Sequence, residues 1–265
     1  MNFYKYIMLL LFTTTYSQTV FTENFNNYPV NTVSNNITGS AYGIGNWYTK
    51  NILFNGVTNN GNTSDYKIVA EPLKGNILQL EVIKGYGIWN RHMYRNDLTP
   101  LFAQRNNTNK ILKISFDYFF GKKIKGYSAG VPASTTFFML RNNKENLVSV
   151  ACYPANAIGA YLPIQRNNTT LVGLTGVKSY GFRDPKNISQ SLEIPENTWV
   201  TIEIYLDYNT SKMYFSLPAY NCTFVTDASF KLELDGVEHD DTPYQFDIIK
   251  GNVNFGGPED LVSKI

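Results

Sequence analysis

The chain has 265 residues, of which 17% are charged, 15% aromatic and 43% hydrophobic. This composition excludes a mainly disordered chain, because it supplies enough apolar side chains for a sizeable core. A formal net charge of +2 is too small for the basic surface of a nucleic-acid-binding protein, and the presence of only two histidines disfavours histidine-based metal sites.

The first 18 residues have the pattern of a secretory signal peptide. Lys5 precedes an apolar run over Tyr6–Phe12, and a polar stretch follows. The run is too short to cross a bilayer, and no later stretch approaches the roughly 20 apolar residues of a membrane helix. We therefore expect a signal peptide at 1–18, a single domain at 19–265 and no membrane span. The protein is expected to be secreted or held at the cell surface.

Alternation of apolar and polar residues predicts most of the secondary structure. Strands are expected around Leu78–Val82, Leu112–Phe120, Thr135–Leu140 and Leu147–Cys152, and a hairpin over Trp199–Leu217. No window of a dozen residues shows the 3.6-residue period of an amphipathic helix. The pattern predicts an all-β fold, an antiparallel β-sandwich.

Two cysteines remain after the predicted signal peptide, Cys152 and Cys222. In an oxidising compartment they could form one disulfide. The alternative is two separately buried thiols. Neither cysteine lies in a recognisable nucleophile motif.

Charge is unevenly distributed along the chain. Residues 85–125 are basic, and residues 190–247 are acidic. Two interpretations remain open: complementary solvated surfaces of one fold, or a functional charged groove.

A short aromatic and basic segment is the main candidate for ligand binding. Aromatic faces can stack on sugar rings, while guanidinium and imidazole groups bind hydroxyls or uronate carboxylates. Alternation places Arg91 and Arg95 on one face of this strand, and His92 with Tyr94 on the other. The alternative is that Trp89 and Met93 pack in the core and the arginines are solvated. The candidate ligand-binding residues are Tyr86, Trp89, Arg91, His92, Tyr94 and Arg95, with Tyr180 and Arg183 from a second cluster that includes Phe182.

Four stretches together suggest a family. They are Thr22–Tyr28, a glycine-rich stretch leading to Trp47, Trp199–Lys212 and Gln245–Ile249. Their pattern resembles secreted concanavalin A-like (laminin-G-like) jelly-roll domains of Bacteroidota. The resemblance implies two stacked antiparallel sheets, of which the concave one often binds glycans and sometimes carries glycosidase or lyase residues.

Glu23 and Asp247 are the candidate metal ligands. Glu23 lies between Phe21 and Phe25 at strand spacing, so it is expected to face the core with them and to need a partner. Related jelly-roll modules often hold one structural Ca²⁺ between an acid on the first strand and another on the last, and the resemblance implies these roles for Glu23 and Asp247. The alternative is that Glu23 pairs with a lysine or arginine, or lies at a frayed edge.

A catalytic alternative rests on Glu233, Asp235 and Glu238. Their spacing fits the Glu-x-Asp-x-x-Glu pattern of family 16 glycoside hydrolases, in which one carboxylate attacks the anomeric carbon and another donates a proton, with Asp235 orienting them. Gly236 interrupts this strand and little sheet can follow it, so a chance match is the better explanation. The Arg-x-Glu-x-Arg and Gln-x-His patterns of alginate lyases are absent.

These observations favour a secreted, non-catalytic carbohydrate-binding or adhesion domain with a polysaccharide or glycan as its partner. One alternative is a glycoside hydrolase or polysaccharide lyase on the same fold. Another is a structural cell-surface domain whose partner is a protein.

Overall fold

The computed structural model describes residues 21–53, 61–82, 89–103, 110–122, 135–141, 146–153, 157–163, 177–210, 212–227, 244–251 and 262–265. At 52–53, 89–90, 146–147, 157, 159–163, 177–180 and 227 the description covers the backbone alone. The predicted signal peptide lies outside the described residues. So do Tyr86 and the three candidate catalytic acids, Glu233, Asp235 and Glu238.

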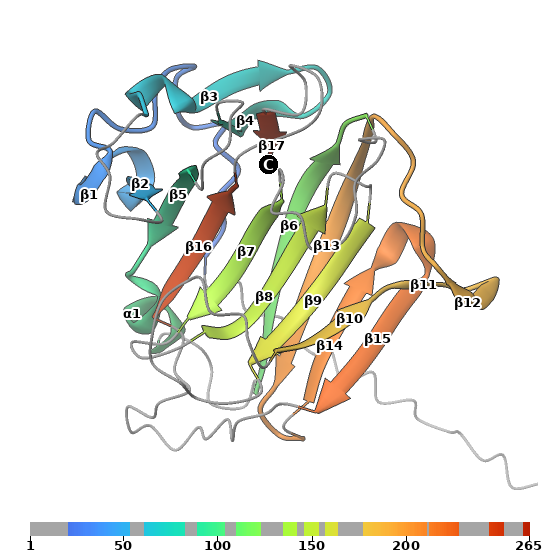
Figure 1. Cartoon of the computed structure of the whole chain (residues 1–265). Coiled ribbons are helices and arrows are strands. Elements are labelled where there is room, and N and C mark those ends of the chain that lie inside the picture. Colours follow the sequence, from blue (N-terminus) through green and yellow to red (C-terminus); the bar gives the residue numbers. More distant parts are fainter. Residues whose placement is uncertain are drawn as a thin grey trace, which may run out of the picture.

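The larger of the two main sheets has eight strands, and every pairing in it is antiparallel (Figure 1). In spatial order the strands are β1 (Thr38–Tyr42), β2 (Tyr48–Leu53), β5 (Trp89–Arg95), β16 (Gln245–Lys250), β7 (Thr136–Arg141), β8 (Asn146–Tyr153), β9 (Ala157–Pro163) and β10 (Val177–Gly181).

A four-stranded antiparallel sheet packs behind the first in this view (Figure 1). Its strands, in spatial order, are β15 (Cys222–Asp227), β14 (Lys212–Leu217), β13 (Thr198–Asp207) and β6 (Ile111–Phe120).

The remaining elements are small. A three-stranded sheet consists of β17 (Val262–Lys264), β4 (Gly75–Glu81) and β3 (Tyr66–Glu71), and a two-stranded ribbon of β11 (Arg183–Asp184) and β12 (Asn187–Ser191). The helical elements are α1 (Leu98–Ala103), η1 (Ile44–Asn46), η2 (Thr63–Asp65) and η3 (Pro218–Tyr220). Within the described ranges, none of these helices is long and apolar enough to cross a membrane.

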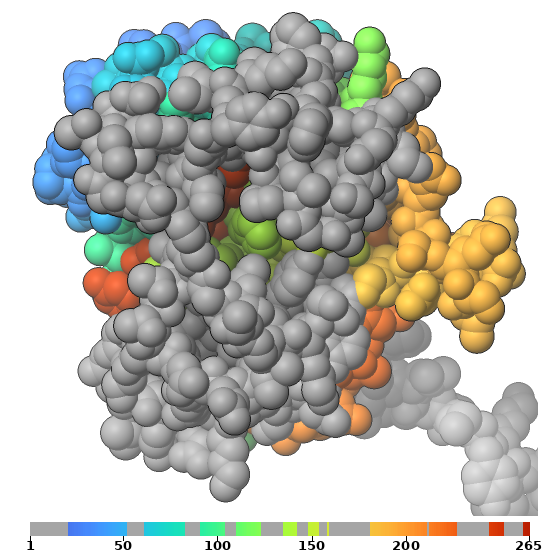
Figure 2. Space-filling model, viewed as in Figure 1, coloured from blue at the N-terminus to red at the C-terminus, as the bar shows by residue number. Residues whose placement is uncertain are grey.

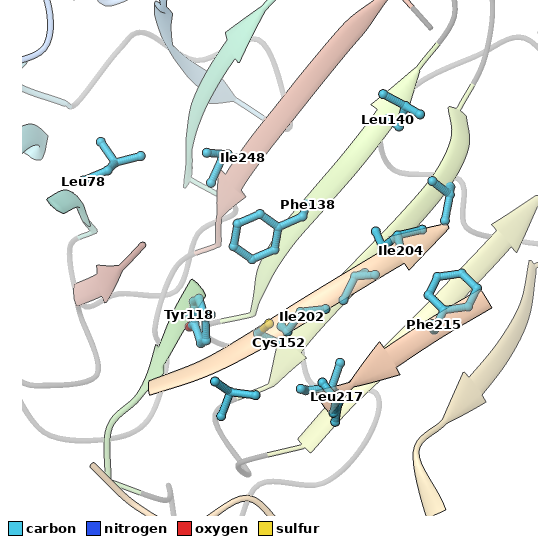
Figure 3. Packing of buried hydrophobic residues seen from close by; sticks show 14 of the residues in the cluster. Leu78, Tyr118, Phe138, Leu140, Cys152, Ile202, Ile204, Phe215, Leu217 and Ile248 are labelled. Atoms are coloured by element: carbon cyan, nitrogen blue, oxygen red, sulfur yellow. The ribbon is translucent and has the colours of Figure 1, made fainter. Parts of the chain in front are cut away.

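The core lies between the two main sheets, where the apolar positions of their strands meet. On β13 every second residue from Val200 to Leu206 is buried, because side chains alternate between the two faces of a strand. Phe138 and Ile248 reach the same cluster from the eight-stranded sheet (Figure 3). Phe138 is 1% exposed, and its ring stacks on Phe116 at a centroid distance of 3.9 Å.

The structure confirms the predicted fold class, an all-β fold built as an antiparallel β-sandwich. The predicted hairpin corresponds to β13 and β14, and its turn is closed by Asp207, whose carboxylate accepts hydrogen bonds from the amides of Asn209 and Thr210. Helix is scarce, as expected, because the one described α-helix has six residues.

The predicted disulfide is wrong, because both cysteines are free and buried. Cys152 lies on β8 in the eight-stranded sheet, whereas Cys222 lies on β15 in the four-stranded sheet. The Cys222 thiol donates a hydrogen bond to the Arg183 carbonyl oxygen at 3.0 Å. Burial raises the pKa of both thiols, so neither is a reactive thiolate at neutral pH. The alternative of two separately buried thiols is the correct one.

Replacing a ring of the core should reduce stability strongly. We expect Phe138→Ala to lower the free energy of unfolding by about 3 to 5 kcal/mol, because it removes a buried ring and leaves a cavity. Ile188→Ala is the control, since Ile188 is 79% exposed, and its effect should stay within about 0.5 kcal/mol. Urea denaturation measures both variants, and equal losses would contradict this description of the core.

Thiol titration tests the corrected cysteine assignment. Protein purified without reductant should present two thiols per chain to Ellman's reagent once it is unfolded in guanidinium chloride. The folded protein should react slowly, because both sulfur atoms are buried. If the unfolded chain shows no reactive thiol, the two cysteines form a disulfide and the assignment of free thiols is wrong.

Candidate functional site

The candidate site lies on the outer face of the eight-stranded sheet, defined as the face turned away from the four-stranded sheet. Phe138 and Ile248 point inward to the core. Because side chains alternate along a strand, Met139, which follows Phe138, and Asp247, which precedes Ile248, point outward. In the space-filling view from the same side, atoms of β16 and its neighbouring strands are visible near the middle of this face (Figure 2).

Strand register aligns a continuous rung of residues across this face. Each member pairs with the next on the neighbouring strand, so the rung crosses the sheet from β2 to β10. Its members are Tyr48, Tyr94, Asp247, Met139, Ser149, Tyr161 and Ser179.

Three tyrosines from neighbouring strands form what we call the tyrosine row: Tyr42, Tyr48 and Tyr94. Tyr42 is 62% exposed and meets Tyr48 edge to face, with centroids 6.0 Å apart and planes at 78°. Tyr48 stacks on Tyr94 at 5.0 Å and 10°. The Tyr94 ring then contacts the His92 ring at 4.8 Å. The row therefore runs from an exposed ring at the edge strand β1 to an imidazole on β5.

Tyr94 is held in place by the backbone of β1. Its hydroxyl donates a hydrogen bond to the Gly39 carbonyl oxygen at 3.1 Å. A side chain at Gly39 would place its Cβ 3.1 Å from that hydroxyl, and Gly39 also has a φ of +77°, so glycine is required here. The pKa of Tyr94 is raised by partial burial and by the nearby Tyr48 and Asp247, so its phenol remains a neutral hydrogen-bond donor.

His92 and Asp247, which we call the floor pair, lie at the inner end of the row. His92 Nε2 and Asp247 Oδ1 are hydrogen-bonded, and the Gln245 side-chain amide also donates to Oδ1. Both residues of the pair are buried, with exposures of 4% and 0%, although they lie on the face opposite the core. Arg141 Nε lies 3.9 Å from Asp247 Oδ2, which is an ion-pair distance but too long for a hydrogen bond.

Within the described part of the chain, three buried polar atoms at the floor pair lack a hydrogen-bond partner. They are His92 Nδ1, Asp247 Oδ2 and Arg141 Nε. A buried unsatisfied polar atom costs about 1 to 3 kcal/mol, so such atoms call for a specific explanation. Their concentration where an aromatic row ends favours a ligand site over ordinary sheet packing.

Tyr66 of β3 fixes the strands of the site from the inner side. Its hydroxyl lies 2.7 Å from both the Lys50 carbonyl oxygen and Asn51 Oδ1, and it accepts a hydrogen bond from the His92 amide at 3.2 Å. The ring is fully buried. Tyr66 thereby joins β2 to β5 and positions both strands of the tyrosine row.

The structure divides the predicted aromatic and basic segment as alternation indicates. His92 and Tyr94 lie on the outer face, whereas Arg91 and Arg95 share the inner side with Met93. Met93 is in the core, as one interpretation predicted, but the expectation of solvated arginines is wrong, since Arg91 and Arg95 are 0% and 4% exposed.

Carboxylates compensate the two buried arginines. Arg91 Nε donates to Asp65 Oδ2 at 2.7 Å, although its two terminal nitrogens have no hydrogen-bond partner among the residues that the structure describes. Arg95 binds Asp97 through two hydrogen bonds, and its guanidinium lies over the Phe21 ring at 3.8 Å. These contacts keep both arginines away from a ligand on the outer face.

The second predicted cluster lies far from the first. Tyr180 is on β10, which is separated from β5 by four strands, and its register partner is Ala160, one residue off the rung. Phe182 packs in the core against Phe224, and Arg183 is exposed on the ribbon at the opposite side of the molecule (Figure 1). Trp89 occupies the position opposite Leu53.

Glu23 does not lie on a strand, so the expected first strand around it is wrong. Phe25, two residues on, has a φ of 57°, which a strand does not accommodate. The Glu23 carboxylate accepts hydrogen bonds from the Tyr28 hydroxyl at 3.0 Å and from the Trp47 indole at 3.3 Å.

The Ca²⁺ with ligands Glu23 and Asp247 stays a prediction. The two carboxylates have different hydrogen-bond partners, because Asp247 is bound by His92 and Gln245. Among the residues that the structure describes, no group of three or more His, Cys, Asp and Glu side chains is arranged to hold a metal ion.

Sequence reasoning missed Tyr42, Tyr48, Lys50 and Arg141. Each is an unremarkable residue in its own segment, and only the pairing of distant strands brings them together. The one local indication was the Gln245–Ile249 stretch, where a carboxylate alternates with apolar residues on a strand.

Comparisons with known proteins give structural likenesses but no family. No protein-family model matches the sequence, and no curated protein does. A sialidase is 9% identical with a TM-score of 0.42, and the match covers 76% of this chain but 16% of the sialidase. An alginate lyase from Klebsiella pneumoniae is 9% identical with a TM-score of 0.42, covering 76% of this chain and 81% of the lyase. Lectin II from Ulex europaeus is 11% identical with a TM-score of 0.38, covering 83% and 89%. At these identities and TM-scores the likenesses assign no function to this chain.

A double-mutant cycle tests the floor pair. We expect His92→Leu to lower the free energy of unfolding by about 1 to 3 kcal/mol or more, because it leaves the buried Asp247 carboxylate without its imidazole partner. The double variant His92→Leu/Asp247→Leu should lose less than the sum of the two single variants, since removing both partners leaves no uncompensated charge. Urea denaturation of the four proteins measures the coupling, and strictly additive losses would show that the pair is not formed.

Proposed function

We propose that the protein is a secreted, non-catalytic glycan-binding protein that holds its ligand along the tyrosine row. The observation that carries the proposal is the row itself, a line of ring contacts from the exposed Tyr42 to the buried floor pair. The resemblance to secreted glycan-binding jelly rolls and the predicted signal peptide support it further. A ligand in this position crosses the edge of the sheet from β1 towards β5.

Tyrosine suits a sugar ligand because it combines an apolar ring with a polar tip. The ring faces can cover the C–H faces of a pyranose, while the hydroxyls bond to sugar hydroxyls. The stack of Tyr48 on Tyr94 limits the freedom of both rings, so less side-chain entropy remains to be lost on binding. Gln245, which is partly exposed beside the floor pair, adds an amide that can both donate and accept.

The non-catalytic part of the proposal follows from burial. A retaining or inverting glycosidase needs two carboxyl groups that reach the scissile bond. Asp247 is 0% exposed and its Oδ1 is occupied by His92 and Gln245, so it acts here as a group that positions others. The hydrolase alternative with Glu233, Asp235 and Glu238 lies outside the described residues and stays an alternative.

Binding is tested by native gel electrophoresis in gels that contain dissolved polysaccharides, each with added calcium and with EDTA. The wild type should be retarded by at least one polysaccharide. We expect Tyr42→Ala to raise the dissociation constant about 2- to 10-fold, taking the ring contact to be as strong as an aromatic pair, about 0.5 to 1.5 kcal/mol. Tyr42 is 62% exposed, so this change should leave the fold intact.

Tyr214→Ala is the matched control, because Tyr214 is a partly exposed strand tyrosine on the four-stranded sheet. It should bind like the wild type. Equal losses of affinity for Tyr42→Ala and Tyr214→Ala would show that the tyrosine row is not the binding site. A wild type that no polysaccharide retards would overturn the proposal. Release of reducing sugar above background by the wild type would show that the protein is an enzyme.

A further inference from the structure

Exposed charge around the tyrosine row is positive in the described part of the chain. Lys50 of β2 is exposed and lies beside His92 in the register. Arg141 of β7, with a side chain 30% exposed, lies at the far side of the floor pair. The carboxylate between them, Asp247, is fully buried and already bonded to His92 and Gln245. A ligand that approaches this face therefore contacts the cations of Lys50 and Arg141 before it reaches the carboxylate of Asp247.

On the four-stranded sheet, in contrast, lysines pair with carboxylates. On its outward side Lys113 pairs with Glu203 at 2.6 Å, and Lys74 pairs with Asp117 at 2.7 Å. Burial alone would raise the pKa values of Glu203 and Asp117. The lysine contacts, together with hydrogen bonds from Tyr205 to Glu203 and from Thr201 to Asp117, outweigh it and hold both pKa values below their usual range. Within the described residues Lys50 has no such carboxylate, and Arg141 Nε has no hydrogen-bond partner.

We infer that the ligand of the tyrosine row is an anionic glycan, whose carboxylate or sulfate groups are bound by Lys50 and Arg141. The inference rests on the proposed function and names its substrate class. A guanidinium presents two parallel N–H donors that match a planar carboxylate or two sulfate oxygens, and an ammonium adds a compact charge.

The spacing of the two cations indicates a polymer. Lys50 and Arg141 lie on β2 and β7, with β5 and β16 between them, so three strand spacings of about 4.8 Å separate their backbones across the sheet. The register offsets them along the strands as well. One sugar ring does not extend that far, so the two cations would contact charged groups on different sugar units of one chain.

Two matched pairs of polysaccharides test the inference with the full-length protein. Polygalacturonate is compared with its methyl ester, and κ-carrageenan with agarose, so that each pair differs mainly in carboxylate or sulfate charge. We expect at least fivefold tighter binding to the charged member of one pair, with affinity that falls as NaCl is raised. The pair that responds identifies the anionic group.

Two variants assign the charge contacts. Lys50→Gln and Arg141→Gln should each weaken binding to the charged polysaccharide about fivefold and reduce its salt dependence. Lys50 is exposed, so its variant keeps the fold even where the Arg141 variant does not. Lys186→Gln, which removes an exposed cation from the distant ribbon, is the control and should bind like the wild type.

The outcomes separate this inference from the proposed function. Equal affinity for both members of both pairs, with Lys50→Gln unchanged and Tyr42→Ala weakened, overturns the anionic ligand and leaves glycan binding in place. No binding to any of the four polysaccharides overturns both.

Discussion

The candidate site depends on the pairing of β16 between β5 and β7. The alternation of a single strand sends Ile248 into the core and Asp247 to the outer face, so one residue of register decides both packing and site. A shift by one residue would bury a carboxylate among the core rings and expose an isoleucine. The apolar packing of the sandwich therefore fixes the position of the floor pair more firmly than the polar contacts of that pair do.

Local patterns predicted the elements well because each depends on neighbours in sequence. Alternation located β6, β13 and β14, and it separated Arg91 from His92 on β5. The same argument failed for Glu23, where the positive φ of Phe25 turns the chain out of a strand. The apparent strand spacing of three residues is too short a pattern to exclude a loop.

The composition of the site could not be predicted, because it comes from pairings between distant segments. Tyr48 and Asp247 become neighbours of Tyr94 only through the register of β2 and β16 on β5. The order of strands within a sheet is not encoded in the periodicity of any one strand. The free cysteines have a similar explanation, since each lies on a different sheet and sequence spacing contains no information about that.

The floor pair also limits how early the eight-stranded sheet can close during synthesis and folding. His92 and Asp247 are 155 residues apart, so the pair cannot form until the chain has been synthesised through Asp247. Sheets closed by such distant contacts fold slowly, because the entropy of a long loop must be lost before the contact forms. Newly made molecules would therefore pass through a stage in which β5 has been synthesised but does not yet pair with β16. Their exposed edge is then open to pairing with another chain, which makes the interval before β16 docks the period of greatest aggregation risk.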